Sequence, residues 1–173
     1  MLARLLTAPA RRAAARRLFD EVTRVWRDPQ LFAEGGFADD PDGRFEACAL
    51  FSTVLFTRLA GRGAQAEELS QAVFDITFKA FDQALRDLGV GDVHVGKRIR
   101  LMAESFYGRL HAYRPALEAR DAAALAGEIA RNGLGRPVEP GGFEHTVAER
   151  ALAWLATLDG VSDARLLDGR PGG

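Results

Sequence analysis

The chain has 173 residues and a formal net charge of −1, and 47% of its residues are hydrophobic. This length fits one domain, the apolar fraction is sufficient for one core, and the near-neutral charge argues against specific DNA binding. The single cysteine, Cys48, excludes an intrachain disulfide and lies among hydrophobic residues, which is typical of a small core residue. No uninterrupted apolar stretch reaches the roughly 18 residues that indicate a membrane-spanning helix.

The N-terminal segment is strongly basic. Residues 1–17 contain no acidic residue and five arginines, which are Arg4, Arg11, Arg12, Arg16 and Arg17. This composition is compatible with an irregular basic start of the first helix. Clustered arginines also attract phosphate, which would favour contact with a ribosome or an anionic membrane surface. An arginine-rich segment without acidic residues is typical of a cleaved import signal as well, and the sequence leaves the three interpretations open.

Hydrophobic periodicity predicts helices and no strand. We expect helices at residues 10–27, 45–59, 67–88, 94–114, 122–132 and 143–158. Pro29 and Pro115 mark the ends of the first and the fourth of these helices, because the residue before a proline disfavours the helical conformation. The sequence therefore predicts an all-α fold, a single irregular bundle of about six helices. Its expected parts are a basic N-terminal segment (1–17), a helical domain (18–159) and a flexible tail (160–173).

Two of these helices have unusually wide apolar surfaces. Helix 45–59 is apolar on almost every side, so we expect it to be buried in the core. Helix 67–88 carries an additional apolar stripe, formed by Phe74, Phe78, Phe81, Leu85 and Leu88. A surface this wide is typical of a helix at the centre of a bundle, or of one that keeps a face for a partner. We expect helices 67–88 and 94–114 at the centre. If this helix keeps a face for a partner, the stripe, with Phe51 and Phe56 beside it, is the candidate for an apolar groove that binds the partner.

Helix 94–114 has a core face and a polar face. The core face follows helical spacing through Val95, Ile99, Met102, Phe106, Leu110 and Tyr113. The polar face, which we predict to bind a partner, consists of Lys97, Arg100, Glu104, Tyr107 and His111. Tyrosine and arginine are the residue types that most often anchor interfaces. The alternative is a solvated face on which Arg100 pairs with Glu104.

Residues for catalysis or metal binding do not occur in a known pattern. The three histidines lie on different expected elements and lack the spacing of a metal site. Gly91, Gly96 and Lys97 have the spacing of a phosphate-binding loop. However, Arg98 stands where that loop has Ser or Thr, and the preceding residues have the period of a helix rather than a strand. We therefore expect no catalytic, cofactor-binding or metal-binding residue, and the protein is predicted not to be an enzyme.

An ordered set of short motifs runs through the chain. They are Asp42-Gly43-Arg44-Phe45, Ala72-Val73-Phe74-Asp75, Leu88-Gly89-Val90-Gly91-Asp92, Val95-Gly96-Lys97-Arg98, Phe106-Tyr107-Gly108-Arg109, Tyr113 and Ala130-Arg131-Asn132. In this order they resemble the ubiquinol–cytochrome c chaperone family, and the resemblance covers roughly residues 15–132. The high content of Ala, Arg and Gly and the short N-terminal extension are typical of a bacterial member.

The resemblance implies an assembly factor for the ubiquinol–cytochrome c reductase (bc1) complex that binds newly made cytochrome b. It implies a cytoplasmic protein that acts peripherally at the inner membrane of a bacterium, or on the matrix side of the mitochondrial membrane in a eukaryote. From its residues alone, the chain is predicted only to be a helical binding module. The alternative function is the binding of a small hydrophobic ligand, such as a lipid or quinone, between the helices.

Overall fold

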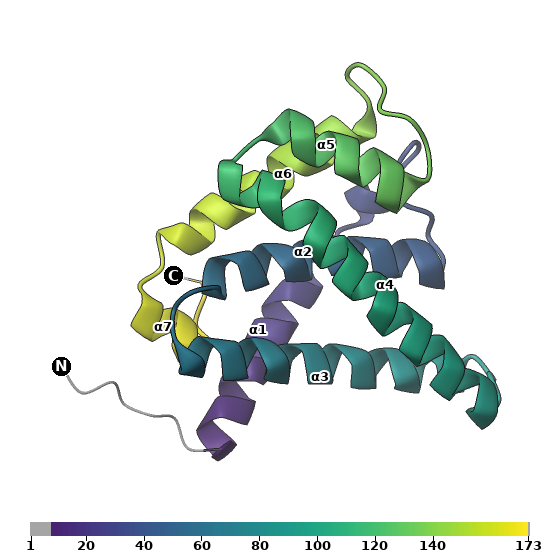
Figure 1. The fold of residues 1–173 in the computed structure, drawn as a ribbon. Coiled ribbons are helices and arrows are strands. Elements are labelled where there is room, and N and C mark those ends of the chain that lie inside the picture. Colours follow the sequence, from purple (N-terminus) through teal and green to yellow (C-terminus); the bar gives the residue numbers. More distant parts are fainter. Residues whose placement is uncertain (1–7, 173) are drawn as a thin grey trace.

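The computed structural model describes residues 8–172, and Figure 1 shows that they form helices joined by turns and loops, with no strand. The α-helices are α1 (Ala8–Trp26), α2 (Pro41–Leu59), α3 (Ala64–Asp87), α4 (Asp92–Ala119), α5 (Ala122–Ile129), α6 (Phe143–Asp159) and α7 (Asp163–Leu167). A 3-10 turn (Pro29–Phe32) precedes α2, and a π-helical turn (Ala130–Leu134) continues α5. The predicted all-α fold class is confirmed.

Helix α2 forms the centre of the bundle, where α1, α4 and α6 pack around it (Figure 1). Its N-terminus is fixed by Asp40, whose carboxylate accepts hydrogen bonds from the backbone N–H groups of Asp42 and Gly43 at 3.0 and 2.8 Å. Pro41 follows as the first helical residue, so the helix begins earlier than predicted. Almost all of its apolar side chains are buried, and Leu55 is only 1% exposed. The prediction of a buried core helix is confirmed.

Helices α3 and α4 lie beside α2 rather than at the centre, so that part of the prediction is wrong. Helix α3 packs against both α1 and α4 and runs along one edge of the molecule (Figure 1). Its wide apolar surface serves two contacts, because Leu69 and Val73 belong to the main core and Phe78 belongs to a second cluster. Periodicity indicates how wide an apolar surface is, but not how many neighbours cover it.

Helix α4 is longer than predicted because it continues through Pro115 to Ala119. A proline inside a helix removes a backbone hydrogen bond and costs about 3 kcal/mol. The next two residues, Ala116 and Leu117, are 6% and 0% exposed, and their burial offsets this cost. The helix ends at Arg120, which has a left-handed backbone with φ of 56°. The prediction that Pro115 ends the helix is therefore wrong.

The two ends of the described chain pack against each other. Helix α1 continues without a break across residue 17, and Ala14 is completely buried. The expected flexible tail contains α7, whose Leu166 is also completely buried. Gly169 lies so close to Ala14 that a Cβ atom would collide with the Ala14 backbone. The described parts of both segments therefore pack against the bundle. Their composition does not reveal this tertiary contact.

Candidate partner-binding surface on helix α4

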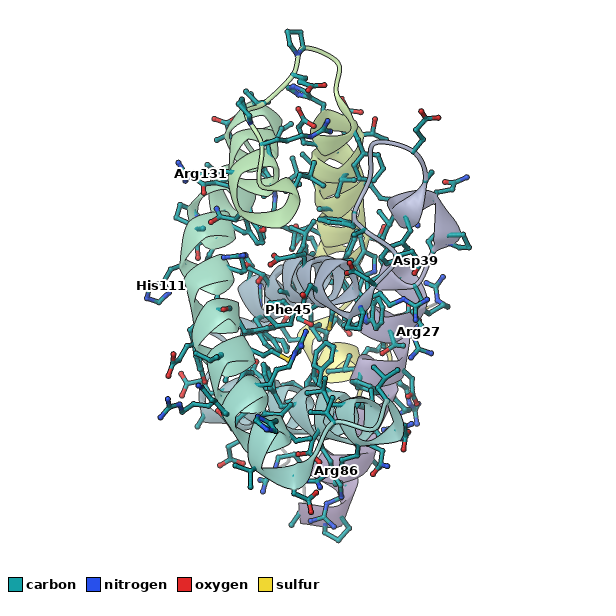
Figure 2. The ribbon with its side chains drawn as sticks, turned by 90° about the vertical axis from the view of Figure 1, so that its right-hand side faces the viewer. Arg27, Asp39, Phe45, Arg86, His111 and Arg131 are labelled. Carbon is teal, nitrogen blue, oxygen red and sulfur yellow. The ribbon has the colours of Figure 1, made fainter. Side chains whose placement is uncertain are left out.

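The residues predicted to bind a partner form one exposed row along α4. They are Lys97, Arg100, Glu104, Tyr107 and His111, and all are exposed. Figure 2 shows His111 pointing away from the bundle. Arg100 Nε lies 3.7 Å from a carboxylate oxygen of Glu104, and a surface pair of this kind contributes little stability. The helix brings these side chains together as expected, and their binding of a partner stays a prediction.

Tyr107 is the aromatic member of this row and is 48% exposed. Its ring packs against that of Phe74 on α3, with ring centroids 5.4 Å apart and an angle of 31° between the ring planes. This contact fixes the tyrosine ring while leaving about half of the side chain open to solvent. A rigid, half-exposed aromatic side chain among charges is typical of the few residues that supply most of the energy of an interface.

Two hollows lie beside this row. One, of about 570 Å³, lies between α4 and α2, and Lys97, Leu101 and Ser105 are on its α4 side. The other, of about 280 Å³, lies between α4 and α3, where Tyr107 and Leu110 form part of the wall. Leu101 is 47% exposed. The row of five residues together with Leu101 is called the α4 surface below; it presents two apolar side chains framed by polar and charged ones.

The phenylalanine stripe of α3 is not one continuous open groove: its central part packs in the core, and Phe81, Leu85 and Leu88 also line a cavity beside α1. Phe78 and Phe106 are 7% and 1% exposed, and they belong with Phe45 to a second core cluster. Aromatic rings pack against each other within this cluster, with centroid distances of 5.7 Å for Phe78 and Phe106 and 5.8 Å for Phe45 and Phe81. Phe51 is completely buried in the main core. Core packing therefore accounts for most of the stripe.

Two arginines connect α4 to α2. Arg109 donates two hydrogen bonds to the carboxylate of Glu46, both 2.7 Å long, and Arg98 donates one of 2.7 Å to Asp42. The hydrogen bonds from Arg109 to Glu46 raise the pKa of the guanidinium in spite of its partial burial, which opposes the rise. Helical periodicity places both arginines beside the core face of α4, but it does not show which neighbouring helix they contact.

Cys48 is a buried core thiol and is 2% exposed. Burial raises its pKa to about 12, although a contact with Ser52, at 3.8 Å between Sγ and Oγ, acts in the opposite direction. The thiolate is the reactive form of cysteine, so this residue is a poor nucleophile at neutral pH. Within the described part of the chain, no group of three or more His, Cys, Asp or Glu side chains is placed to hold a metal ion.

We expect Cys48 to resist alkylation in the folded protein. With a pKa of about 12, only about one thiol in ten thousand is ionised at about pH 8. Labelling by iodoacetamide, followed by mass spectrometry, should be about a hundredfold or more slower in buffer than in urea, where the thiol recovers an ordinary pKa of about 8.5. Similar rates in both conditions would mean that the thiol is accessible in the folded state.

The described residues thus form an all-helical domain with an exposed polar, aromatic-bearing surface on α4. The sequence model of the ubiquinol-cytochrome C chaperone family matches residues 33–172, so this chain belongs to that family. The chain is also similar to the crystal structure of the Cbp3 homolog from Brucella abortus, with 31% sequence identity and a TM-score of 0.77. That similarity covers 94% of this chain and 89% of the Brucella chain. No curated protein is significantly similar to the sequence.

Proposed function

We propose that this protein is a chaperone for assembly of the cytochrome bc1 complex, and that it binds newly made cytochrome b through the α4 surface. The observation that carries the proposal is the family match over residues 33–172, a range that includes the whole α4 surface. The similarity to the Cbp3 homolog supports it across nearly the full chain. Holding an unassembled subunit requires no bond to be made or broken, so we infer that the protein is not an enzyme.

The α4 surface has properties that suit this task. A newly made membrane protein exposes apolar helices before lipid or partner subunits cover them. A protein that holds such helices needs exposed apolar side chains, but few enough and sufficiently framed by charge to avoid self-association. Leu101 and Tyr107 are 47% and 48% exposed and lie among the charged residues of α4. They would provide the apolar contacts.

We expect the double variant Arg100→Glu with Tyr107→Ala to capture about thirtyfold less cytochrome b from solubilised membranes, as for loss of an interface anchor. Its free energy of unfolding should fall by only about 1 kcal/mol, from the lost contact of Tyr107 with Phe74. Cytochrome b bound to the tagged protein is measured by quantitative mass spectrometry, and assembled bc1 complex in cells should fall as well.

A matched control for this test is Arg131→Glu with Val138→Ala. It also reverses one exposed arginine and truncates one apolar side chain that is 48% exposed, both of them outside α4 (Figure 2 labels Arg131). The control should capture cytochrome b normally. Normal capture by the α4 variant would place the cytochrome b site elsewhere, and equal loss in both variants would show that the effect is not specific to α4.

We propose that the protein acts in the cytoplasm, where it associates peripherally with the inner membrane. In a mitochondrion, it would act on the matrix side of the membrane. None of the described helices combines the length and the hydropathy needed to cross a membrane. The N-terminal arginines are the proposed contact with anionic lipid or with a ribosome.

Arg4 lies outside the described residues. Arg11 pairs with Glu68 and Arg17 donates to the Asp168 carbonyl, whereas Arg12 is exposed.

We expect Arg12→Gln with Arg16→Gln to weaken sedimentation with phosphatidylglycerol vesicles by about tenfold or more, because each basic residue near an anionic surface contributes about 1 kcal/mol. Substitution is preferable to deletion of residues 1–17, because Ala14 belongs to the core. The control Arg24→Gln with Arg131→Gln removes the same charge elsewhere and should bind like the unchanged protein. Equal sedimentation of both variants at every salt concentration would exclude these arginines as the contact.

A further inference from the structure

A cavity of about 330 Å³ lies between α1, α3 and the N-terminal part of α2. Its apolar walls include Phe19, Trp26, Phe81, Leu85, Leu88 and Met102. Exposed charged residues surround its opening, and Figure 2 shows two of them, Arg27 and Asp39, on the same side of the molecule. The volume is at the lower end for small-molecule sites, and a helix about 10–12 Å wide would not fit inside. The space suits one hydrocarbon chain.

Three residues at the C-terminal end of α1 contribute to the cavity wall and carry hydrogen-bond donors. They are Thr23 and Trp26, in the last turn of the helix, and Arg27, which follows it directly. Thr23 Oγ1 and Trp26 Nε1 are buried, and neither has a hydrogen-bond partner among the described residues. Trp26 as a whole is only 8% exposed. Buried donors without a partner are costly, so a ligand that brings an acceptor would be stabilised here.

The opening carries three arginines and three aspartates, and one of the arginines is not held in an ion pair by any described residue. Two of the three arginines are held in ion pairs of 2.8 and 2.7 Å, Arg44 with Asp39 and Arg98 with Asp42. Asp40 is occupied as the N-cap of α2. Arg27 is exposed, and its guanidinium lies over the ring of Trp26, 5.2 Å from the centroid, without an ion pair to any described residue. The available cation therefore lies next to an unpaired donor, which favours an anionic, acceptor-rich head group.

We propose that this cavity binds a single-chain anionic amphiphile, of which a fatty acid anion is the simplest example. The hydrocarbon chain lies in the apolar cavity, and the head group accepts hydrogen bonds from Arg27. Thr23 Oγ1 and Trp26 Nε1, which are buried in this structure, would join as donors once their side chains turn toward the head group. The same chemistry is available from a free fatty acid or from one chain and the head group of an anionic phospholipid. This site shares no residue with the α4 surface, although Arg98 and Met102 of α4 also line it, and it does not depend on the proposed binding of cytochrome b.

The fluorescence of Trp26 can test the proposal directly. The chain has two tryptophans, so Trp154→Phe leaves Trp26 as the only reporter. Bromine-labelled dodecanoate is expected to quench its fluorescence in a saturable way. Arg27→Gln should weaken this binding about tenfold or more, as for loss of a charged hydrogen bond. Ala84→Phe should weaken it similarly, because Ala84 is an exposed residue of the cavity wall. The matched control Ala153→Phe, at an exposed position of α6 outside the cavity, should leave the binding unchanged.

Several outcomes would overturn the proposal. One is quenching that does not saturate, and another is binding that neither Arg27→Gln nor Ala84→Phe affects. Equally tight binding of bromine-labelled dodecanol would refute the anionic head group. Loss of cytochrome b capture by Ala84→Phe would assign the cavity to the cytochrome b site instead of a separate lipid site. Phosphatidylglycerol vesicles with brominated chains identify the source: quenching by vesicles supports a membrane lipid, and quenching by dodecanoate alone supports a free fatty acid.

Discussion

Replacement of Leu55 by alanine is expected to lower the free energy of unfolding by about 2–5 kcal/mol, as for other leucines removed from a close-packed core. Leu55 is 1% exposed and lies on α2, the helix around which α1, α4 and α6 pack. The loss has two parts: the transfer free energy of the deleted methine and methyl groups, and the cavity that remains when the surrounding helices relax only partly. Urea unfolding at 25 °C, followed by circular dichroism, measures it.

Leu101→Ala is the matched control for this prediction. It is the same substitution in α4, at a leucine that is 47% exposed. The expected loss is below about 0.5 kcal/mol, which is usual for surface positions. A loss of that size for Leu55→Ala as well would contradict the central, buried position of α2.

Replacement of Arg58 by alanine is expected to cost about 3 kcal/mol. Arg58 is 5% exposed and joins the end of α2 to the turn between α6 and α7. It donates hydrogen bonds to the carbonyl groups of Leu158 and Val161, at 3.0 and 2.8 Å, and to the carboxylate of Asp163 at 2.8 Å. Hydrogen bonds of a charged group contribute about 1.5–3 kcal/mol each. The expected loss is smaller than the sum for three such bonds because Nη1 of Arg58 is buried without a partner among the described residues, and the variant removes that cost.

Arg62→Ala provides the comparison, because Arg62 bonds the same carboxylate of Asp163 at 3.1 Å but is 38% exposed. Its loss should cost less than about 1 kcal/mol. The pair of variants therefore separates the buried hydrogen bonds of Arg58 from ion pairing at the surface. Similar unfolding curves for both variants would mean that Arg58 does not fasten α7 to the bundle.

The effect of Arg58 should also depend on pH. The hydrogen bond from Arg58 lowers the pKa of Asp163, so this carboxylate is easier to ionise in the folded than in the unfolded protein. Its contribution is fully present above the unfolded pKa of about 3.9 and is lost as the pH falls through the lower folded pKa. Below that pH, the difference between the unchanged protein and Arg58→Ala should shrink. A difference that stays constant through this pH range would exclude a role for the ionised Asp163.

Several features of this protein were determined by the sequence itself. Helical periodicity predicted the all-α fold and the six longest helices to within a few residues, except at Pro115 and at the early start of α2. The apolar surface of helix 45–59 predicted that α2 would be buried. The spacing of Lys97, Arg100, Glu104, Tyr107 and His111 predicted one exposed row on α4, and the ordered motifs predicted the family. Each of these is a property of a single helix or of a short stretch of chain, and such local properties can be predicted from the sequence alone.

Only the tertiary structure decided how the helices pair. It placed α2 rather than α3 and α4 at the centre, joined Arg109 to Glu46, and packed Leu166 into the core. It also brought Trp26 of α1 and Phe81 of α3 to the same cavity. These contacts depend on the rotation and register of helices that are far apart in the chain. Periodicity does not fix either quantity, because an apolar surface can be buried equally well against several different neighbours.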